Sequence, residues 1–360
     1  MTVYQALQLN AAGSKKLIAE TEDRKLRLKW SAVYVFKVLL TVAFCFLFVT
    51  AFSVVFGNDN SIVGVVVLLA LLAMRQADFG IKTSHGVGVL LLIFAIWAVV
   101  PKAANLVSPA AAFLLNFAAL FVISVSGCHN IIMYNQFTFA LGFLLLEGYE
   151  AKGVVFRQRL AALALGAVIC SLVYWKNHRK ASYRRTAENI RKEFDLTSQR
   201  SRWQLGFSLA IASSMLAAEL LGLPRTMWVG ISVMSMTVMF REDVFYRAKR
   251  RAPFGAVGCV LFLLIYYLVP VSLHPYIGIL GGIGVGFSAS YSWQTIFNTL
   301  GAVYIASAIF GPWGAVLLRI TANVFATAYA LGFQEIFKDV YKRQEQAGGY
   351  PPRQGRRCPD

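Results

Sequence analysis

Two arginines inside apolar stretches carry the clearest chemistry in this sequence. Arg159 and Arg319 each lie several residues into an apolar run, counted from its expected external end. A guanidinium keeps its positive charge, and its planar fork can hold both oxygens of a carboxylate. We therefore expect the two residues to attract and bind an anion. The alternative is that each long side chain only reaches the nearest polar interface.

Two glutamates near the ends of other apolar runs are candidates for carrying a proton. These are Glu147 and Glu219. A carboxylate moved away from water holds its proton more tightly, so protonation near neutral pH becomes feasible. Either residue could instead pair with an arginine. The simplest alternative, which the positions near helix ends favour, is an interfacial residue without a role in coupling.

No pattern typical of catalysis accompanies these residues. The sequence has no phosphate-binding loop, no nucleophile elbow, no HExxH helix and no CxxC pair. Its four histidines are scattered, and none is spaced to share a metal with another. The glycines of 278–286 have apolar flanks, which favours close packing of membrane helices. The sequence therefore predicts no enzyme, no metal site and no cofactor.

The elements that must position these residues are membrane helices. Of 360 residues, 58% are hydrophobic and only 14% are charged, more apolar surface than a soluble protein of this size can bury. The apolar runs approach the roughly 17–25 residues that span a bilayer. The sequence predicts an all-α, multi-pass bundle of about twelve spans. These are 31–56, 61–74, 86–100, 108–126, 130–147, 156–175, 203–222, 226–240, 253–270, 275–290, 294–311 and 313–337.

The distribution of Lys and Arg predicts the orientation. The net charge is +18, and most basic residues fall on one side if both termini are cytoplasmic. Anionic lipid, and not nucleic acid, is then the partner of this charge. We expect a bacterial inner-membrane protein, and the sequence leaves a homo-oligomer open. The expected topology anchors, which would also gather cytoplasmic anions, are Arg75, Arg241, Arg247 and Arg251.

The two halves of the chain resemble each other. Trp30 and Trp203 open them, Val100-Pro101 and Val269-Pro270 end the third span of each, and the two arginines recur late in each. Two repeats of six spans share one orientation and are related by an axis along the membrane normal. The predicted parts are a basic N-terminus (1–30), a first repeat (31–175), a linker (176–202), a second repeat (203–337) and a disordered tail (338–360).

The linker at 176–202 is basic and too short to form a domain. We expect a solvated connector that lies against anionic lipid. The alternative, a regulatory ligand site, has no specific support in the sequence.

One stretch carries a family resemblance. Between Leu205 and Gly258 the chain has Leu223-Pro224-Arg225-Thr226-Met227-Trp228, then Phe240-Arg241, then Arg247, Arg251, Gly255 and Gly258. Arg159 is followed by Gly166 seven residues later, whereas Ala326 takes the equivalent place after Arg319. In these features the chain resembles the fusaric acid resistance protein-like family, related to aromatic acid exporters, over about residues 30–337.

The resemblance implies proton-driven efflux of aromatic or other organic carboxylates. Arg159 and Arg319 would then bind a small organic anion, and Glu219 or Glu147 would carry the proton. The wider group also resembles plant malate channels, so passive anion conduction is an alternative. A non-transporting scaffold, in which the basic linker and turns bind a partner, is another. Many relatives have a sizeable cytoplasmic domain where this chain has only its linker.

Overall fold

The computed structural model describes residues 1–75, 77–129, 135–239 and 241–337, without the side chains of Arg241 and Glu242. This part of the chain is 84% helical and has no strand. The all-α prediction is therefore confirmed. The predicted tail 338–360 lies outside the described residues.

Each predicted span overlaps a helix or half of one, although residues 130–134 and 240, at the ends of two predicted spans, lie outside the described residues. Long apolar runs without internal breakers form these helices, and Pro, Gly or polar turns separate them. The N-terminal part contains α1 (Val3–Gln8), α2 (Ala11–Glu20), α3 (Arg24–Phe56), η1 (Asn58–Asn60), α4 (Ser61–Met74), α5 (Thr83–Ala104), α6 (Pro109–Gly127), α7 (Asn135–Gly148) and α8 (Gly153–His178). The remainder contains α9 (Ala187–Lys192), α10 (Gln199–Leu220), α11 (Thr226–Met236), α12 (Arg241–Leu268), η3 (Val271–Tyr276), α13 (Ile277–Phe287) and α14 (Tyr291–Ile336).

Six of the described helices are long and apolar enough to cross a membrane: α3, α5, α6, α8, α12 and α14. Helix α14 joins two predicted spans, and Gly311 breaks it with a backbone φ of 68°. Shorter apolar segments, of 10–17 residues, lie at Asn58–Met74, Thr226–Met236 and Val271–Phe287, and a spanning helix typically needs about 20. Multiple membrane spans are thus shown, whereas twelve spans, two repeats and cytoplasmic termini stay predictions.

The chain forms two compact units by its internal contacts. Among the described residues, the first contains Met1–Leu47 and Tyr246–Val324, and the second contains Phe48–Phe245 and residues 325–337. Each unit is described by itself below.

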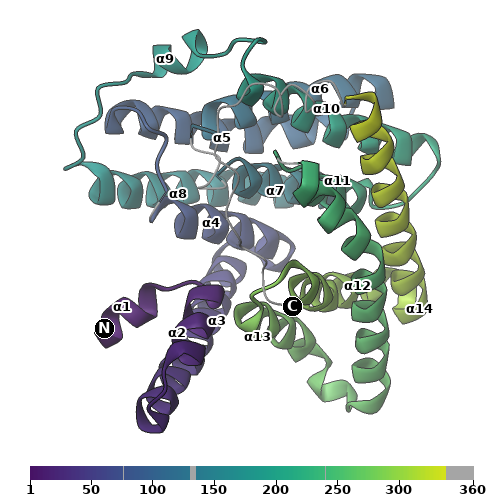
Figure 1. Ribbon diagram of the computed structural model, residues 1–360. Coiled ribbons are helices and arrows are strands. Elements are labelled where there is room, and N and C mark those ends of the chain that lie inside the picture. The colour runs from purple at the N-terminus through teal and green to yellow at the C-terminus, as the bar shows by residue number, and fades with distance from the viewer. Residues whose placement is uncertain (76, 130–134, 240, 338–360) are drawn as a thin grey trace. The chain divides into compact units, whose positions relative to one another are not determined.

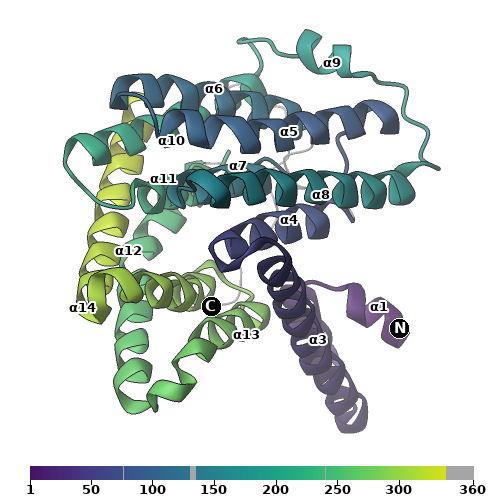
Figure 2. The same cartoon turned by 180° about the vertical axis from the view of Figure 1, so that it is seen from behind.

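The second unit is a bundle in which α5, α6, α8 and α10 run side by side (Figures 1 and 2). Helix α4 packs between α7 and α8, where Val63, Val66 and Val67 are fully buried. Gly166 of α8 allows this approach, because a Cβ there would lie 2.4 Å from a methyl group of Val67. The glycine that follows Arg159 in the family-like pattern is thus a packing requirement.

The first unit brings α12 and α14 into close contact. A Cβ on Gly258 would lie 2.6 Å from the carbonyl oxygen of Ile296, so only glycine fits there. In the same unit, the Lys37 ammonium donates to the Leu9 carbonyl (2.9 Å) and to the Ser14 hydroxyl (2.6 Å). These contacts fasten the short helices α1 and α2 to α3.

Candidate functional site

Arg159 holds the end of a neighbouring helix. It lies in α8 with 5% of its surface exposed. Its Nη1 donates to the carbonyls of Leu146 (3.3 Å) and Tyr149 (2.5 Å), and its Nε donates to Asn60 Oδ1 (3.3 Å). The last carbonyls of a helix lack intrahelical donors and carry partial negative charge. Arg159 therefore caps α7 from inside the unit and does not extend to the surface.

A small hollow lies beside Arg159. Its lining includes Trp97, Lys102, Glu150 and Phe156, and its free volume is about 10 Å³. That volume is about one water molecule. The hollow as it stands is therefore too small for an aromatic acid.

The two predicted proton carriers lie in electrostatic range of each other. Glu147 is in the last turn of α7, and Glu219 is in the last turn of α10. Glu219 is exposed, whereas Glu147 is half-buried and its Oε2 is buried with no donor from the described residues. Both carboxylates face the negative end of a helix dipole, which disfavours a further negative charge. The structure thus brings together two residues that the sequence offered as alternatives.

Arg225 is a residue of this region that the sequence analysis did not select. Its guanidinium lies over the rings of Tyr149 (5.1 Å) and Trp228 (5.9 Å). It is the one described non-glycine residue with positive φ, at 56°. Such a conformation is costly for most residues and is held by its surroundings. The signal in the sequence was the Leu223-Pro224-Arg225 turn, which was recognised only as part of a family pattern.

Arg319 lies in the first unit, on α14, with 5% of its surface exposed. Asn323 follows it by one turn, and the Asn323 Oδ1 accepts a hydrogen bond from Arg251 Nε at 3.2 Å. A Cβ on Gly255 would lie 2.5 Å from Asn323 Nδ2. The family-like residues Arg251 and Gly255 therefore form the contact of α12 with α14. Because Arg159 belongs to the other unit, a shared anion site of the two arginines stays a prediction.

The predicted topology anchors differ in their surroundings. Arg251 is buried at 6% exposure, whereas Arg75 is exposed. The Arg247 guanidinium lies 5.2 Å from the Tyr291 ring centre. The side chain of Arg241 lies outside the described residues. Their role as anchors stays a prediction, and for Arg251 the structure adds a role in helix packing.

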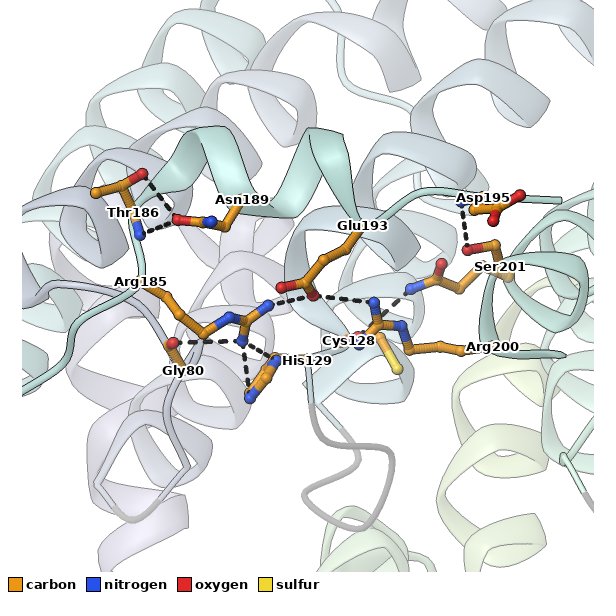
Figure 3. Close-up of polar contacts among 11 residues, drawn as sticks. Gly80, Cys128, His129, Arg185, Thr186, Asn189, Glu193, Asp195, Arg200 and Ser201 are labelled. Atoms are coloured by element: carbon orange, nitrogen blue, oxygen red, sulfur yellow. Dashed lines mark hydrogen bonds and ion pairs between the residues drawn. The ribbon is translucent and has the colours of Figure 1, made fainter. Parts of the chain in front are cut away.

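The linker is fastened to the second unit by a polar cluster that we call the linker clamp, formed by His129, Arg185, Glu193 and Arg200 (Figure 3). Glu193 Oε2 accepts from Arg185 Nη2 and, at 3.1 Å, from Arg200 Nη2. Arg185 Nη1 also contacts both ring nitrogens of His129, with Nε2 at 2.9 Å. One linker carboxylate thus joins a linker arginine to an arginine of α10.

Electrostatics favour a charged glutamate and a neutral histidine in the clamp. Desolvation raises the pKa of Glu193, but hydrogen bonds and charge from Arg185 and Arg200 outweigh it and hold that pKa below its ordinary value. Burial lowers the pKa of His129, and the positive charges of Arg185 and Arg200 lower it further. A neutral imidazole can accept a hydrogen bond from Arg185, which a protonated one cannot.

Further contacts hold the linker along its length. The Tyr183 hydroxyl donates to Asp78 Oδ2 (2.7 Å), and the Ala187 amide donates to His85 Nδ1 (3.0 Å). The linker is therefore a docked segment, a feature that its basic composition did not reveal. Composition does not predict this docking, because two of the partner residues, His129 and Asp78, are far from the linker in the sequence.

The geometry and the helix lengths define the class of protein: a multi-pass α-helical membrane protein with buried arginines. Residues 211–333 match the family model described as fusaric acid resistance protein-like, which confirms the predicted resemblance for this stretch. No curated protein and no solved structure matches the chain. Because the family comprises transporters and not enzymes, the match indicates a transporter-like membrane protein.

Proposed function

We propose that this protein exports organic carboxylates, aromatic ones foremost, across the bacterial inner membrane in exchange for protons. The family match supports a transporter, and the Glu147–Glu219 pair is the observation that supports coupling. Exposed Glu219 takes up a proton from solvent and passes it to Glu147, whose inner oxygen has no donor among the described residues. A negative charge nearby makes a carboxylate hold its proton more tightly.

Arg159 connects the proton site to the anion. Its guanidinium holds the carbonyls of Leu146 and Tyr149, which flank Glu147 in the sequence. A substrate carboxylate is a stronger acceptor than these neutral carbonyls and can use both of its oxygens. We propose that the substrate replaces the carbonyls on Arg159 and thereby releases the end of α7. We propose that Arg319, buried on α14, likewise binds the substrate carboxylate in the other half of the chain.

Flux measurements test this function. The purified protein is placed in liposomes, and movement of benzoate and related aromatic carboxylates is followed with and without an imposed pH gradient. Protein-free liposomes give the background, because neutral aromatic acids cross lipid unaided. We expect accumulation against the substrate gradient only when the pH gradient is present. Flux that merely follows the substrate gradient would replace this function by a channel, and absence of flux across the panel would favour a scaffold.

A further inference from the structure

The linker places a carboxylate and an aromatic ring side by side at the end of the helix bundle. Glu193 contacts Arg185 and Arg200, and the next residue, Phe194, meets the Phe121 ring of α6 edge-on at 5.2 Å between ring centres. A negative group beside a ring is the chemical outline of an aromatic carboxylate. The linker thus carries, in two successive residues, the features that define the proposed substrate.

The receiving side of this contact belongs to the bundle. Arg200 is in the first turn of α10, and Gln204, one turn later, donates to the α6 carbonyls of Ser124 (3.3 Å) and Cys128 (3.4 Å). These bonds fix the end of α6 against α10. The helices that carry Phe121 and Arg200 are therefore joined by contacts that do not involve Glu193 or Phe194.

A row of aromatic rings leads away from this contact. Phe113, Phe117 and Phe121 are spaced by four residues on α6, and their rings stack at 6.3 and 6.0 Å between centres. Rings spaced in this way present a continuous aromatic face along a helix. An aromatic ring that replaces Phe194 would contact Phe121, the ring of this row that Phe194 contacts now.

We propose that Glu193 and Phe194 occupy, as an internal stand-in, a binding site for aromatic carboxylates formed by Arg200 and Phe121. An incoming aromatic carboxylate displaces Glu193 from Arg200 and Phe194 from Phe121, and the linker undocks. The linker then acts as a latch that the substrate itself opens. The identity of the ligand rests on the proposed function, whereas the displaced contact does not.

The contact is suited to exchange. The side chains of Arg185, Arg200 and Glu193 are 26%, 27% and 36% exposed, and ion pairs at such positions are weak and screened by salt. Both arginines contact the same oxygen of Glu193, Oε2. A free carboxylate can present both oxygens to Arg200, which is the stronger arrangement. The adjoining hollow has a free volume of only about 10 Å³, so a ligand binds there only after the linker has moved.

The test measures benzoate binding and hydrogen exchange of linker residues 179–198 on the full-length protein in detergent. Benzoate should accelerate exchange in the wild type. Glu193→Gln and Phe194→Ala should show fast exchange without benzoate and should bind benzoate roughly three- to tenfold more tightly, because the internal competitor is weakened. Glu188→Gln is the matched control, since Glu188 is exposed and pairs with Lys192 within α9. It should behave as the wild type.

Two variants of Arg200 complete the test. Arg200→Gln should abolish the effect of benzoate on the linker, and Arg200→Lys, which keeps the charge but not the fork, should reduce it. Cyclohexanecarboxylate and acetate separate the contribution of the ring from that of the charge. The inference is overturned if Glu193→Gln leaves both exchange and benzoate affinity unchanged, or if benzoate still releases the linker of Arg200→Gln. Benzoate binding and hydrogen exchange do not depend on transport. Both results can therefore be interpreted even if the protein does not export carboxylates.

Discussion

The end of α7 and the linker clamp use arginine in opposite ways within one unit. At the end of α7, Arg159 is buried and holds neutral backbone carbonyls. In the linker clamp, Arg185 and Arg200 are about one-quarter exposed and hold a carboxylate. A buried guanidinium without its acceptors is costly, whereas a half-exposed ion pair is weak. The first arrangement stabilises the structure, and the second is easily exchanged.

Replacing Arg159 should have the largest effect on stability, because its hydrogen bonds are buried. In Arg159→Gln the carbonyls of Leu146 and Tyr149 lose a charged donor, and we expect a loss of about 2–3 kcal/mol in the free energy of unfolding. Thermal unfolding in detergent measures it. Arg157→Gln, two residues away and exposed, is the control and should be neutral. Equal stability of the two variants would show that Arg159 does not cap α7.

Removing the proposed proton carriers should impair coupling without unfolding the protein. Glu147→Gln keeps the shape of the side chain but cannot carry the proton, so a pH gradient should no longer drive accumulation. Exchange of substrate across the membrane should continue. Glu219→Gln should slow the gradient-driven flux instead, since solvent can still reach Glu147 at a lower rate. Glu150→Gln, whose carboxylate pairs with Lys102 and Lys152, serves as the control. Full coupling in Glu147→Gln would contradict the proton path.

A glycine substitution breaks the linker clamp from its far side. Gly80 has a φ of 64°, and a Cβ there would lie 2.0 Å from His129 Cδ2. Gly80→Ala should push the imidazole away from Arg185 and speed hydrogen exchange of residues 179–198 several-fold. Gly222→Ala carries the same backbone cost, with φ 68° and nothing within 4 Å, and should leave the linker docked. If both variants behave alike, backbone strain and not the collision with His129 is responsible.

Acidification should loosen the clamp by a smaller amount. Burial, followed by the charges of Arg185 and Arg200, lowers the pKa of His129, while Glu193 and Asp78 act in the opposite direction. Docking therefore favours the neutral ring, and its contribution is complete above the ordinary value of 6.5 and is lost as the pH falls below it. Linker exchange, corrected for its intrinsic pH dependence, should rise between pH 7.5 and 5.5. His129→Gln should remove this dependence, and a persisting slope would assign it to other groups.

The sequence predicted the helices well and the contacts between them poorly. Helix α4 ends at Met74 as predicted, because a polar turn follows an unbroken apolar run. The break at Gly311 falls at the predicted boundary between the spans 294–311 and 313–337. Arg159 and Glu147 were selected because charge within apolar runs is rare. Their partners were not predictable, since Asn60 and Tyr149 become neighbours of Arg159 only through packing.

The linker shows the same limit more strongly. The length and charge of the linker predicted a connector that lies on lipid. Neither property predicts that Glu193 pairs with Arg200. Docking depends on contacts between segments that are distant in the sequence. The linker residues Tyr183 and Arg185 contact Asp78 and His129, respectively. Periodicity within one helix carries no information about such meetings.

Proton movement recorded together with carboxylate movement tests the central claim most directly. Liposomes that contain the protein and an internal pH indicator receive an outward benzoate gradient without an imposed pH gradient, and protein-free liposomes provide the background. We expect benzoate efflux to drive a matching proton flux in the wild type and to lose that proton flux in Glu147→Gln. Benzoate movement through the wild-type protein without any accompanying proton flux would contradict coupled export.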